Sequence, residues 1–392
     1  MRLLYLHGEA RLHNDVYGRY YTSGTYNEDV WNRYLSICDE LRIVFRKDNE
    51  LYPAGVASKK FNSIPNQANC IALPDVYKPY TNYINKELKK RIDKVIEKEV
   101  YNADRIIIRS LCDYYSNTAL KWCRIYKKKY LVEVISFEFE QLFYHSFLGK
   151  IIAPFNEFKY RLLMKQVPYA VYVTRDKMQK RYPTNGKMIG CSDVEIESYS
   201  EETIKNRIKR IEEQKTIVVG TAASLDVHYK KQELVVKAIA YLKEKMNINI
   251  EYQLVGSGKG VRIMNAAVRN NISNQLKIIG EIPHKEMNRW YDQVDIYIQP
   301  SYVEGVSRAI VEAMSRACPI ICADIGGNSE LITKEWLYKK SNFKRLAFLM
   351  SKMIDKNTQK EAAMRNWVKA EDYSKRKLDC KRSAFYNEFT QE

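Results

Sequence analysis

Residues 300–332 read PSYVEGVSRAIVEAMSRACPIICADIGGNSELI, and this stretch is the most informative part of the chain. Apolar residues recur at helical spacing over 306–316, which predicts a helix there. Short apolar runs over 295–299 and 319–323 predict a buried strand on each side of the helix. A strand, a helix and a second strand in this order form a βαβ unit, so the stretch predicts a parallel sheet with helices on its faces.

The same alternation extends along the rest of the chain. In the second half, the pattern predicts further strands and helices over 216–219, 233–245, 250–255, 276–279 and 284–293. In the first half, it predicts strands and helices over 3–6, 27–40, 41–45, 105–108, 118–126, 130–135 and 170–174. We therefore predict an α/β fold with two doubly wound, Rossmann-like domains, which bind ligands outside the carboxyl ends of their strands.

Residues 184–214 interrupt this alternation with a turn sequence and then a polar run rich in Glu and Lys. We place the linker between the domains in this segment. The predicted domains are 1–195 and 196–367, and we expect a C-terminal helix over 368–392 to rejoin the first domain. A chain of 392 residues, of which 45% are hydrophobic, is long enough to bury two cores.

The chain carries a net charge of +18, which both halves share. A basic surface suits phosphorylated ligands, anionic lipid or nucleic acid. The sharpest basic cluster interleaves five cations with three aromatic rings: Lys121, Trp122, Arg124, Tyr126, Lys127, Lys128, Lys129 and Tyr130. Segment 121–130 suits a lipid headgroup layer and RNA equally well. Because the chain has no standard nucleic-acid reader motif, we expect no nucleic acid as partner.

The sequence shows no targeting or membrane-spanning segment. Apolar runs such as 131–135 are too short to cross a bilayer, and the N-terminus, MRLLYLHGEA, is typical of a buried strand rather than a signal peptide. The eight cysteines are scattered without CxxC spacing. We expect buried, reduced thiols, no zinc site and a cytoplasmic protein.

Two carboxylates and a helix N-terminus in 300–332 point to a ligand. Glu304 precedes the predicted helix and Glu312 lies one to two turns inside it, which separates them by on the order of 10 Å along the axis. Between them, Gly305, Val306 and Ser307 expose backbone N–H groups that favour an anion. A nucleoside diphosphate sugar needs this combination, with acceptors for sugar and ribose hydroxyls and donors for phosphate between.

These residues resemble family 4 of the retaining glycosyltransferases, which have the GT-B fold. The resemblance rests on the Glu304…Glu312 pair and on motifs at the usual spacing: Pro300-Ser301, Glu304-Gly305, Glu312-Ala313-Met314, Pro319 and Gly326-Gly327…Glu330. Upstream, Gly256 and Gly258 resemble the family's glycine loop, and 280–283 resembles the segment before its next helix. The resemblance is strong over 215–345 and weaker over 1–195.

The resemblance implies roles for the second half. Glu304 is expected to bind hydroxyls of the transferred sugar, and Glu312 is expected to hold the ribose. Lys230 matches a basic residue that offsets charge on the departing diphosphate, although the adjacent Lys231 is an alternative. An arginine frequent in the family is Ser224 here, so its phosphate contact is either missing or supplied by Lys259, Arg262 or Arg308.

The first half departs further from the family. Many relatives carry a histidine after the strand predicted over 130–135, where this chain has Ser136, Phe137 and Glu138. Glu138, His145 and His7 are therefore open candidates for the acceptor side. Gly24 resembles the family's glycine loop near the donor phosphates, and a plain turn is an equal alternative.

The resemblance implies a retaining glycosyltransferase that works in bacterial surface polysaccharide synthesis. We expect a UDP-sugar or GDP-sugar donor and a glycan or polyprenyl-diphosphate-linked acceptor, with residues 1–195 on the acceptor side. No cofactor and no metal are expected, because the chain has no Asp cluster. Segment 121–130 is a candidate for peripheral contact with an anionic inner membrane face. Alternatives are a sugar-nucleotide epimerase of GT-B fold or a basic nucleic-acid-binding protein.

Overall fold

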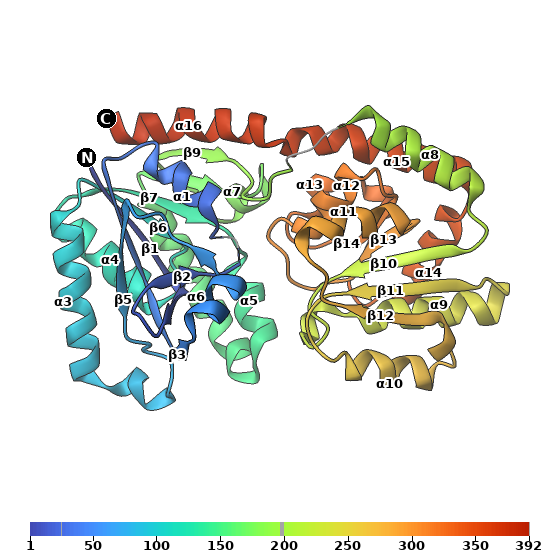
Figure 1. The fold of residues 1–392 in the computed structure, drawn as a ribbon, viewed down its shortest axis with the longest axis horizontal. Coiled ribbons are helices and arrows are strands. Elements are labelled where there is room, and N and C mark those ends of the chain that lie inside the picture. The colour runs from blue at the N-terminus through green and yellow to red at the C-terminus, as the bar shows by residue number, and fades with distance from the viewer. Residues whose placement is uncertain (25, 197–199, 392) are drawn as a thin grey trace.

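The computed structural model describes residues 1–24, 26–196 and 200–391. The chain forms two α/β halves that lie side by side, and its last helix runs along the first half (Figure 1). In these residues, no helix is long and apolar enough to cross a membrane.

The first half is built on a sheet of nine strands, counted over the described residues. Seven strands run parallel in the order β5-β3-β1-β6-β7-β8-β9, and β2 pairs antiparallel with both β1 and β4. The strands are β1 Arg2–Asp15, β2 Tyr20–Thr22, β3 Glu40–Tyr52, β4 Asn62–Ser63, β5 Ala68–Leu73, β6 Arg105–Arg109, β7 Lys129–Val134, β8 Tyr169–Tyr172 and β9 Lys187–Gly190. Because β1 lies inside the sheet, the chain winds outward from it in both directions.

Helices cover both faces of this sheet (Figure 1). They are α1 Glu28–Leu35, α2 Ala54–Lys60, α3 Lys86–Asn102, α4 Tyr114–Ile125, α5 Glu138–His145, α6 Phe147–Lys165 and α7 Lys177–Arg181. Successive residues of β1 point to opposite faces, so Leu4 and Leu6 join one core while Leu3 and Tyr5 join the other.

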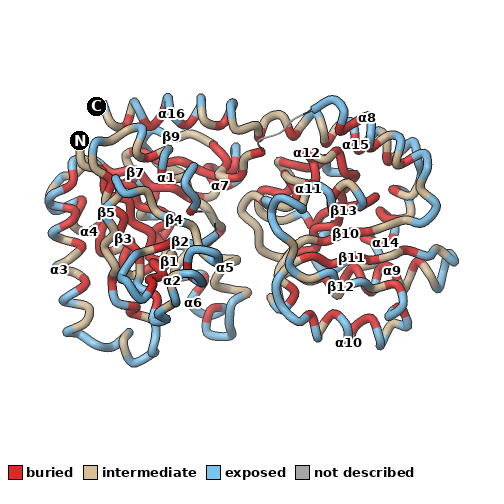
Figure 2. The backbone as a smooth tube through the Cα atoms, in the orientation of Figure 1, coloured by how far each residue is buried: buried red, intermediate tan, exposed pale blue. Residues whose placement is uncertain are grey.

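The second half is built on six parallel strands in the order β12-β11-β10-β13-β14-β15. The strands are β10 Ile217–Ala222, β11 Ile250–Val255, β12 Leu276–Gly280, β13 Ile296–Gln299, β14 Ile320–Ala323 and β15 Leu337–Tyr338. The helices are α8 Glu201–Glu213, α9 Gln232–Met246, α10 Val261–Arg269, α11 His284–Gln293, α12 Arg308–Ser315, α13 Asn328–Leu331, α14 Phe343–Met353 and α15 Lys356–Ala370. Figure 2 shows buried segments along the strands of both halves and exposed ones on the outer helices.

The C-terminal helix α16, Lys375–Gln391, packs on the first half. Its Phe385, Tyr386 and Phe389 are buried in the core on that side of the first sheet. The Tyr386 hydroxyl donates to Glu133 Oε1 at 2.6 Å. The chain therefore passes between the halves twice, and the two passages touch: Ile196 N donates to Tyr373 O, and Lys375 N donates to Ile196 O, both at 3.0 Å.

Glu133 is the centre of a buried polar network in the first half. Besides Tyr386, it accepts from the Tyr34 hydroxyl at 2.7 Å, the Tyr5 hydroxyl at 3.2 Å and Arg109 Nη1 at 3.1 Å. These four donors saturate a carboxylate that is only 5% exposed. The network joins α1, β1, β6 and α16 to β7.

The structure corrects several predicted boundaries. The first strand does not stop at Leu6 but continues to Asp15, with a register shift against β3 between His7 and Arg11. The helix predicted over 27–40 ends at Leu35, and residue 40 already belongs to β3. The helix predicted over 306–316 begins only at Arg308.

The segment taken as the linker, 184–214, is largely structured. It contains β9, which pairs with β8 at the sheet edge, and α8, which packs against α15. Strand β9 has only four residues, and its apolar run of Met188 and Ile189 is too short to predict a strand. Residues 197–199 of this segment lie outside the described residues.

All eight cysteines are free, but the expectation that they are buried holds for only half of them. The buried ones are Cys123, Cys191, Cys318 and Cys322. Cys380 is exposed on α16, and the other three are half-buried.

Candidate active site

The loop between β13 and α12 presents Glu304 to the space between the halves. Its carboxylate Oε1 accepts from Lys230 Nζ at 2.7 Å and from Gln299 Nε2 at 2.9 Å. The Tyr297 hydroxyl donates to Gln299 Oε1 at 2.5 Å and so orients the Gln299 amide. Both bonds to Glu304 end on the same oxygen, and among the described residues no hydrogen bond is made to Oε2. Glu304 is therefore held in place with one oxygen available for a ligand hydroxyl.

The two adjacent lysines differ in their contacts. Lys230 bridges to Glu304, whereas Lys231 Nζ lies 3.7 Å from Glu233 and 5.1 Å from the centre of the Tyr302 ring. Lys231 also has a left-handed backbone, with φ of 55°, where the chain turns into α9. Of the two, Lys230 is the one that the fold places against Glu304.

Glu312 lies on α12, in its second turn. It accepts from the Tyr291 hydroxyl at 3.0 Å, and His284 Nε2 lies 3.6 Å from its other oxygen. The N–H groups of Gly305, Val306 and Ser307, predicted to lie together at the helix start, do not all belong to it, because α12 begins two residues later than predicted. Ser307 occupies the N-cap position, while Gly305 and Val306 belong to the preceding loop.

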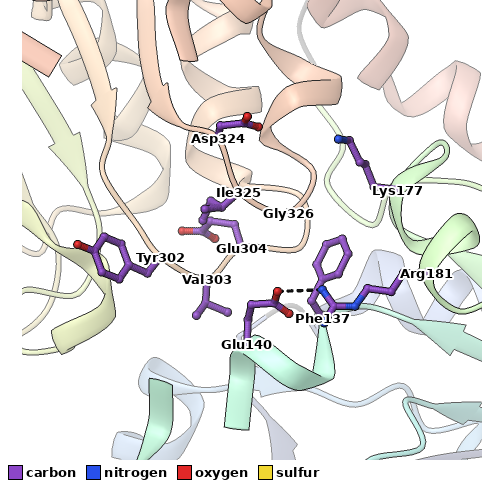
Figure 3. A pocket seen from close by; sticks show the side chains of 10 residues that line it. All are labelled: Phe137, Glu140, Lys177, Arg181, Tyr302, Val303, Glu304, Asp324, Ile325 and Gly326. Atoms are coloured by element: carbon purple, nitrogen blue, oxygen red, sulfur yellow. Dashed lines mark hydrogen bonds and ion pairs between the residues drawn. The ribbon is translucent and has the colours of Figure 1, made fainter. Parts of the chain in front are cut away.

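A cavity of about 260 Å³ lies between the halves beside Glu304. The first half lines it with Phe137, Glu140, Lys177 and Arg181, and the second half with residues 302–304 and 324–326 (Figure 3). Arg181 Nη1 is bonded to Glu140 Oε1 at 2.8 Å, so one cation and one anion of the wall are paired. A neighbouring hollow of about 480 Å³ extends past Lys339 and Lys340. Together they are large enough for part of a polar ligand.

Glycines allow the halves to approach closely at this cavity. A side chain at Gly305 would overlap the carbonyl oxygen of Ile135 in the first half. Gly326, with φ of +47°, lies against Glu304 O, where any side chain would also overlap. Glu330 then reaches across, and its carboxylate accepts from the backbone N–H groups of Arg175, Asp176 and Lys177 at 2.6–3.1 Å. The Gly-Gly…Glu motif is thus a contact between the halves.

The glycine loop at 256–260 is held by hydrogen bonds to Asp226. Asp226 accepts from the backbone N–H groups of Lys259 at 3.0 Å and Gly260 at 2.9 Å, which lowers the pKa of its carboxyl. A side chain at Gly258 would overlap Asp226, and one at Gly256 would overlap Ala223 O. Gly256 and Gly258 therefore permit a tight loop. Their contact with a donor stays a prediction.

Which basic side chain near this loop takes the place of the missing arginine stays a prediction, and the candidates differ in their contacts. Ser224 Oγ donates to Ser257 O at 3.4 Å. Arg262 is held by Glu233 at 3.4 Å, whereas Lys259 and Arg308 are exposed. Arg308 is the first residue of α12 and so lies at the start of the helix.

The acceptor-side candidates are scattered. Glu138, at the start of α5, is 2% exposed and accepts from Ser110 Oγ and Ser136 Oγ at 3.2 and 3.1 Å. Burial, and then the charge of Glu9, raise its pKa to about 7. It lines a small interior hollow, while its neighbours Phe137 and Glu140 line the main cavity.

The other candidates of the first half do not gather at the main cavity. His7 is buried, its Nδ1 lies 2.5 Å from the Tyr26 hydroxyl, and burial and then Arg109 lower its pKa well below the usual value. His145 is exposed at the end of α5. Gly24 forms an exposed turn with φ of +65°, where its carbonyl accepts from Asn62 Nδ2 at 3.4 Å. None of the three is among the residues that line the cavity in the described chain.

Segment 121–130 packs mainly against α3. Trp122 donates to Asp93 and Tyr126 to Glu97, Lys121 pairs with Asp93 at 2.9 Å, and Tyr130 is 5% exposed. Tyr130 is therefore covered by the core, whereas Trp122 and Tyr126 are half-buried against α3, and contact of the segment with a membrane stays a prediction.

Several residues of this site escaped the sequence reasoning. Gln299 ends the strand predicted over 295–299, which was a usable signal, whereas Asp226 lies within the loop after β10 and had no such mark. Lys177 and Arg181 gave no signal, because only the tertiary fold brings α7 to the cavity. Among the described residues, no three His, Cys, Asp or Glu side chains gather as metal ligands would.

The sequence of the chain is similar to those of known proteins. The sequence profile of the glycosyl transferases group 1 family matches residues 200–370. Protein CapJ of Staphylococcus aureus is 30% identical over 389 residues, which cover 97% of this chain and 94% of CapJ. The chain belongs to the group 1 glycosyltransferases.

Two further proteins are similar to this glycosyltransferase, one in sequence and one in fold. The capsular polysaccharide biosynthesis glycosyltransferase CapH of Staphylococcus aureus is 29% identical over 144 residues, 35% of this chain and 37% of CapH. The structure of HepE from Anabaena, solved in complex with UDP, superposes with a TM-score of 0.63 at 13% identity, covering 98% of this chain and 99% of HepE. The glycosyltransferase therefore has the GT-B fold, as predicted.

Proposed function

We propose that this glycosyltransferase transfers a sugar from a nucleotide-sugar donor, a UDP-sugar or GDP-sugar, to a glycan or polyprenyl-diphosphate-linked glycan. The observation that carries the proposal is Glu304, fixed by Lys230 and Gln299 at a cavity between the halves. The similarity to CapJ and CapH supports a role in bacterial surface polysaccharide synthesis, and the UDP bound to HepE supports a nucleotide donor.

The second half binds the donor in this proposal, and residues 1–195 face the acceptor. Glu304 accepts hydroxyls of the transferred sugar, and Glu312 accepts those of the ribose. Lys230, which lies 2.7 Å from Glu304, offsets negative charge on the leaving diphosphate.

The reaction exchanges one bond at the sugar for another. The acceptor hydroxyl oxygen bonds to the anomeric carbon, and the bond from that carbon to the diphosphate oxygen breaks. The hydroxyl proton passes to the leaving diphosphate on the same face of the sugar, which retains the anomeric configuration. The products are the glycosylated acceptor and a nucleoside diphosphate, and no metal enters the step.

A thermal-shift panel of UDP, GDP, ADP and CMP tests the donor assignment. A ligand at 100 times its dissociation constant adds about 2.7 kcal/mol to the free energy of unfolding, so the preferred nucleotide is visible at once. Donor-sugar panels with mass-spectrometric detection then separate transfer from epimerisation, because an epimerase returns an intact sugar nucleotide. Stabilisation by none of the four nucleotides, or an epimerised donor as the only product, contradicts the proposal.

A further inference from the structure

Helix α6 presents a continuous apolar stripe to the outside of the first half. Phe147, Phe155 and Phe158 are 79%, 75% and 67% exposed, and Ile151 and Leu162 continue the same stripe at 55% and 45%. These residues fall at helical spacings of three and four, so they share one side of the helix. Contiguous exposed apolar residues of this size mark an interaction site rather than a surface of ordinary composition.

The stripe is not part of the helix's own packing. The opposite side of α6 supplies the buried residues Gly149, Ala153, Tyr160 and Met164, of which Tyr160 and Met164 join the core of the first half. At Gly149 the helix lies so close to α5 that a side chain would overlap the carbonyl oxygen of Leu142. The inner side is therefore filled, and the outer apolar side is additional to what the fold requires.

The charges of α6 decide what covers the stripe. All four cations of the helix are exposed: Lys150, Lys159, Arg161 and Lys165. Its one acidic residue, Glu157, points inward, where it accepts from Arg181 Nε at 2.7 Å and from the Tyr182 hydroxyl at 2.8 Å. The outer side thus carries apolar and basic groups without an anion. An amphipathic helix of this composition fits the headgroup layer of an anionic bilayer.

We propose that α6 binds this glycosyltransferase to the surface of an anionic lipid bilayer, with the phenylalanine stripe in the headgroup layer and the cations against lipid phosphates. The site differs from segment 121–130, whose rings are held by the protein itself. A docked α6 would also bring the cavity between the halves close to the membrane, because Glu157 of α6 and Glu140 of α5 both bind Arg181, which lines that cavity.

Sedimentation of the full chain with vesicles tests the proposal. One set of vesicles is pure phosphatidylcholine and the other contains 30% phosphatidylglycerol, at low salt. We expect binding to the anionic vesicles, a decrease as salt screens the charges, and slower amide hydrogen exchange over 147–165 in the bound state. The double variant Phe155→Ser/Phe158→Ser should bind at least about tenfold more weakly, and Lys150→Glu/Arg161→Glu should also weaken binding by about fivefold or more per charge.

Matched variants separate α6 from other surfaces. Val268→Ser/Phe348→Ser removes two exposed apolar residues from the second half, and Lys127→Glu/Lys129→Glu reverses two charges of segment 121–130. Both should bind vesicles far better than the α6 variants of the same kind. All variants should keep the wild-type melting temperature and its nucleotide shift.

Three results would overturn the proposal. The first is a wild type that ignores anionic vesicles at low salt, and the second is a phenylalanine variant that binds them as the wild type does. The third is self-association that the same phenylalanine variant abolishes while vesicle binding persists, because the stripe would then be a contact between copies.

Discussion

The two halves use their ionisable residues differently. In the second half, Glu304, Lys230 and Glu312 lie at the edge of the sheet, where loops leave parallel strands or helices begin. In the first half, Glu133 and Glu138 are 5% and 2% exposed and bind protein groups instead. These particular residues therefore differ in role: the three of the second half are placed for the proposed donor, whereas Glu133 and Glu138 bind groups of the first half itself, including the helix that returns to it.

The largest effect is expected from removing the centre of the buried network. Glu133→Ala leaves Arg109 and three tyrosine hydroxyls with one acceptor fewer, and breaking a buried ion pair from one side costs about 3–5 kcal/mol. Urea unfolding followed by circular dichroism measures this loss. The exposed Glu361→Ala is the control and should change the unfolding free energy by less than about 0.5 kcal/mol. A loss below 1 kcal/mol for Glu133→Ala would mean that the network is not what holds the first half.

The second prediction concerns turnover rather than stability. Lys230→Ala should lower turnover by roughly 10²–10³, because a fixed cation near the leaving group acts mainly in the transition state. Lys231→Ala is the control, since Lys231 is turned toward Glu233 and Tyr302. Steady-state kinetics with the donor found in the nucleotide panel checks both variants. Greater damage from Lys231→Ala would reverse the assignment of the two lysines.

A variant at Glu312 tests whether this carboxylate binds the ribose or only supports the helix. Glu312→Ala should weaken nucleoside diphosphate binding by about 1–3 kcal/mol, because ligand hydroxyls lose a charged acceptor. Calorimetry gives the affinity directly. Tyr291→Phe removes only the 3.0 Å bond that orients Glu312 and should cost less. Unchanged affinity in Glu312→Ala with an intact fold would disprove the ribose role.

The smallest effect is a pH dependence in the first half. The pKa of Glu138 is raised to about 7 by burial, from an ordinary value near 4.5. The folded state therefore holds more protons than the unfolded state between these values, so this group lowers stability as pH rises through that window. Glu138→Gln removes the penalty and should be more stable than the wild type by about 1–2 kcal/mol at pH 8, with little difference at pH 4. A variant that is equally stable or weaker at pH 8 would show that Glu138 is not buried as a neutral acid.

Periodicity predicted the second half well and the first half less well. The strand at 250–255 and the helix at 284–293 have the predicted bounds, because compact apolar patterns end there at turns. Helix α3 was not predicted, although its buried Ile92, Ile96 and Val100 recur every four residues, so this helical spacing was a usable signal. Helix α6 was missed because apolar residues on its outer side obscure the periodicity of the inner side.

The residues of the candidate site also differ in how well the sequence predicted them. The glutamate pair stands in a motif with a fixed spacing, and Lys230 precedes a predicted helix, so the sequence alone was enough to propose all three for the site. Arg181 and Phe137 reach the cavity through the approach of two sheets, which no local pattern encodes. The bond from Glu330 to the backbone of α7 is a further case, since the sequence marks the glutamate but not its partner across the gap.

The paired passages between the halves have a mechanical consequence. A single connecting strand works as a swivel, about which one body can twist freely relative to the other. Here Ile196 lies beside Ser374 and makes backbone hydrogen bonds to the residues on either side of it, Tyr373 and Lys375. The two connections are therefore held together as one strap. Such a strap resists torsion but still bends, which leaves opening and closing of the gap as the soft motion. A protease cut or a truncation before α16 would convert the strap to a swivel and loosen the alignment of Glu330 with α7.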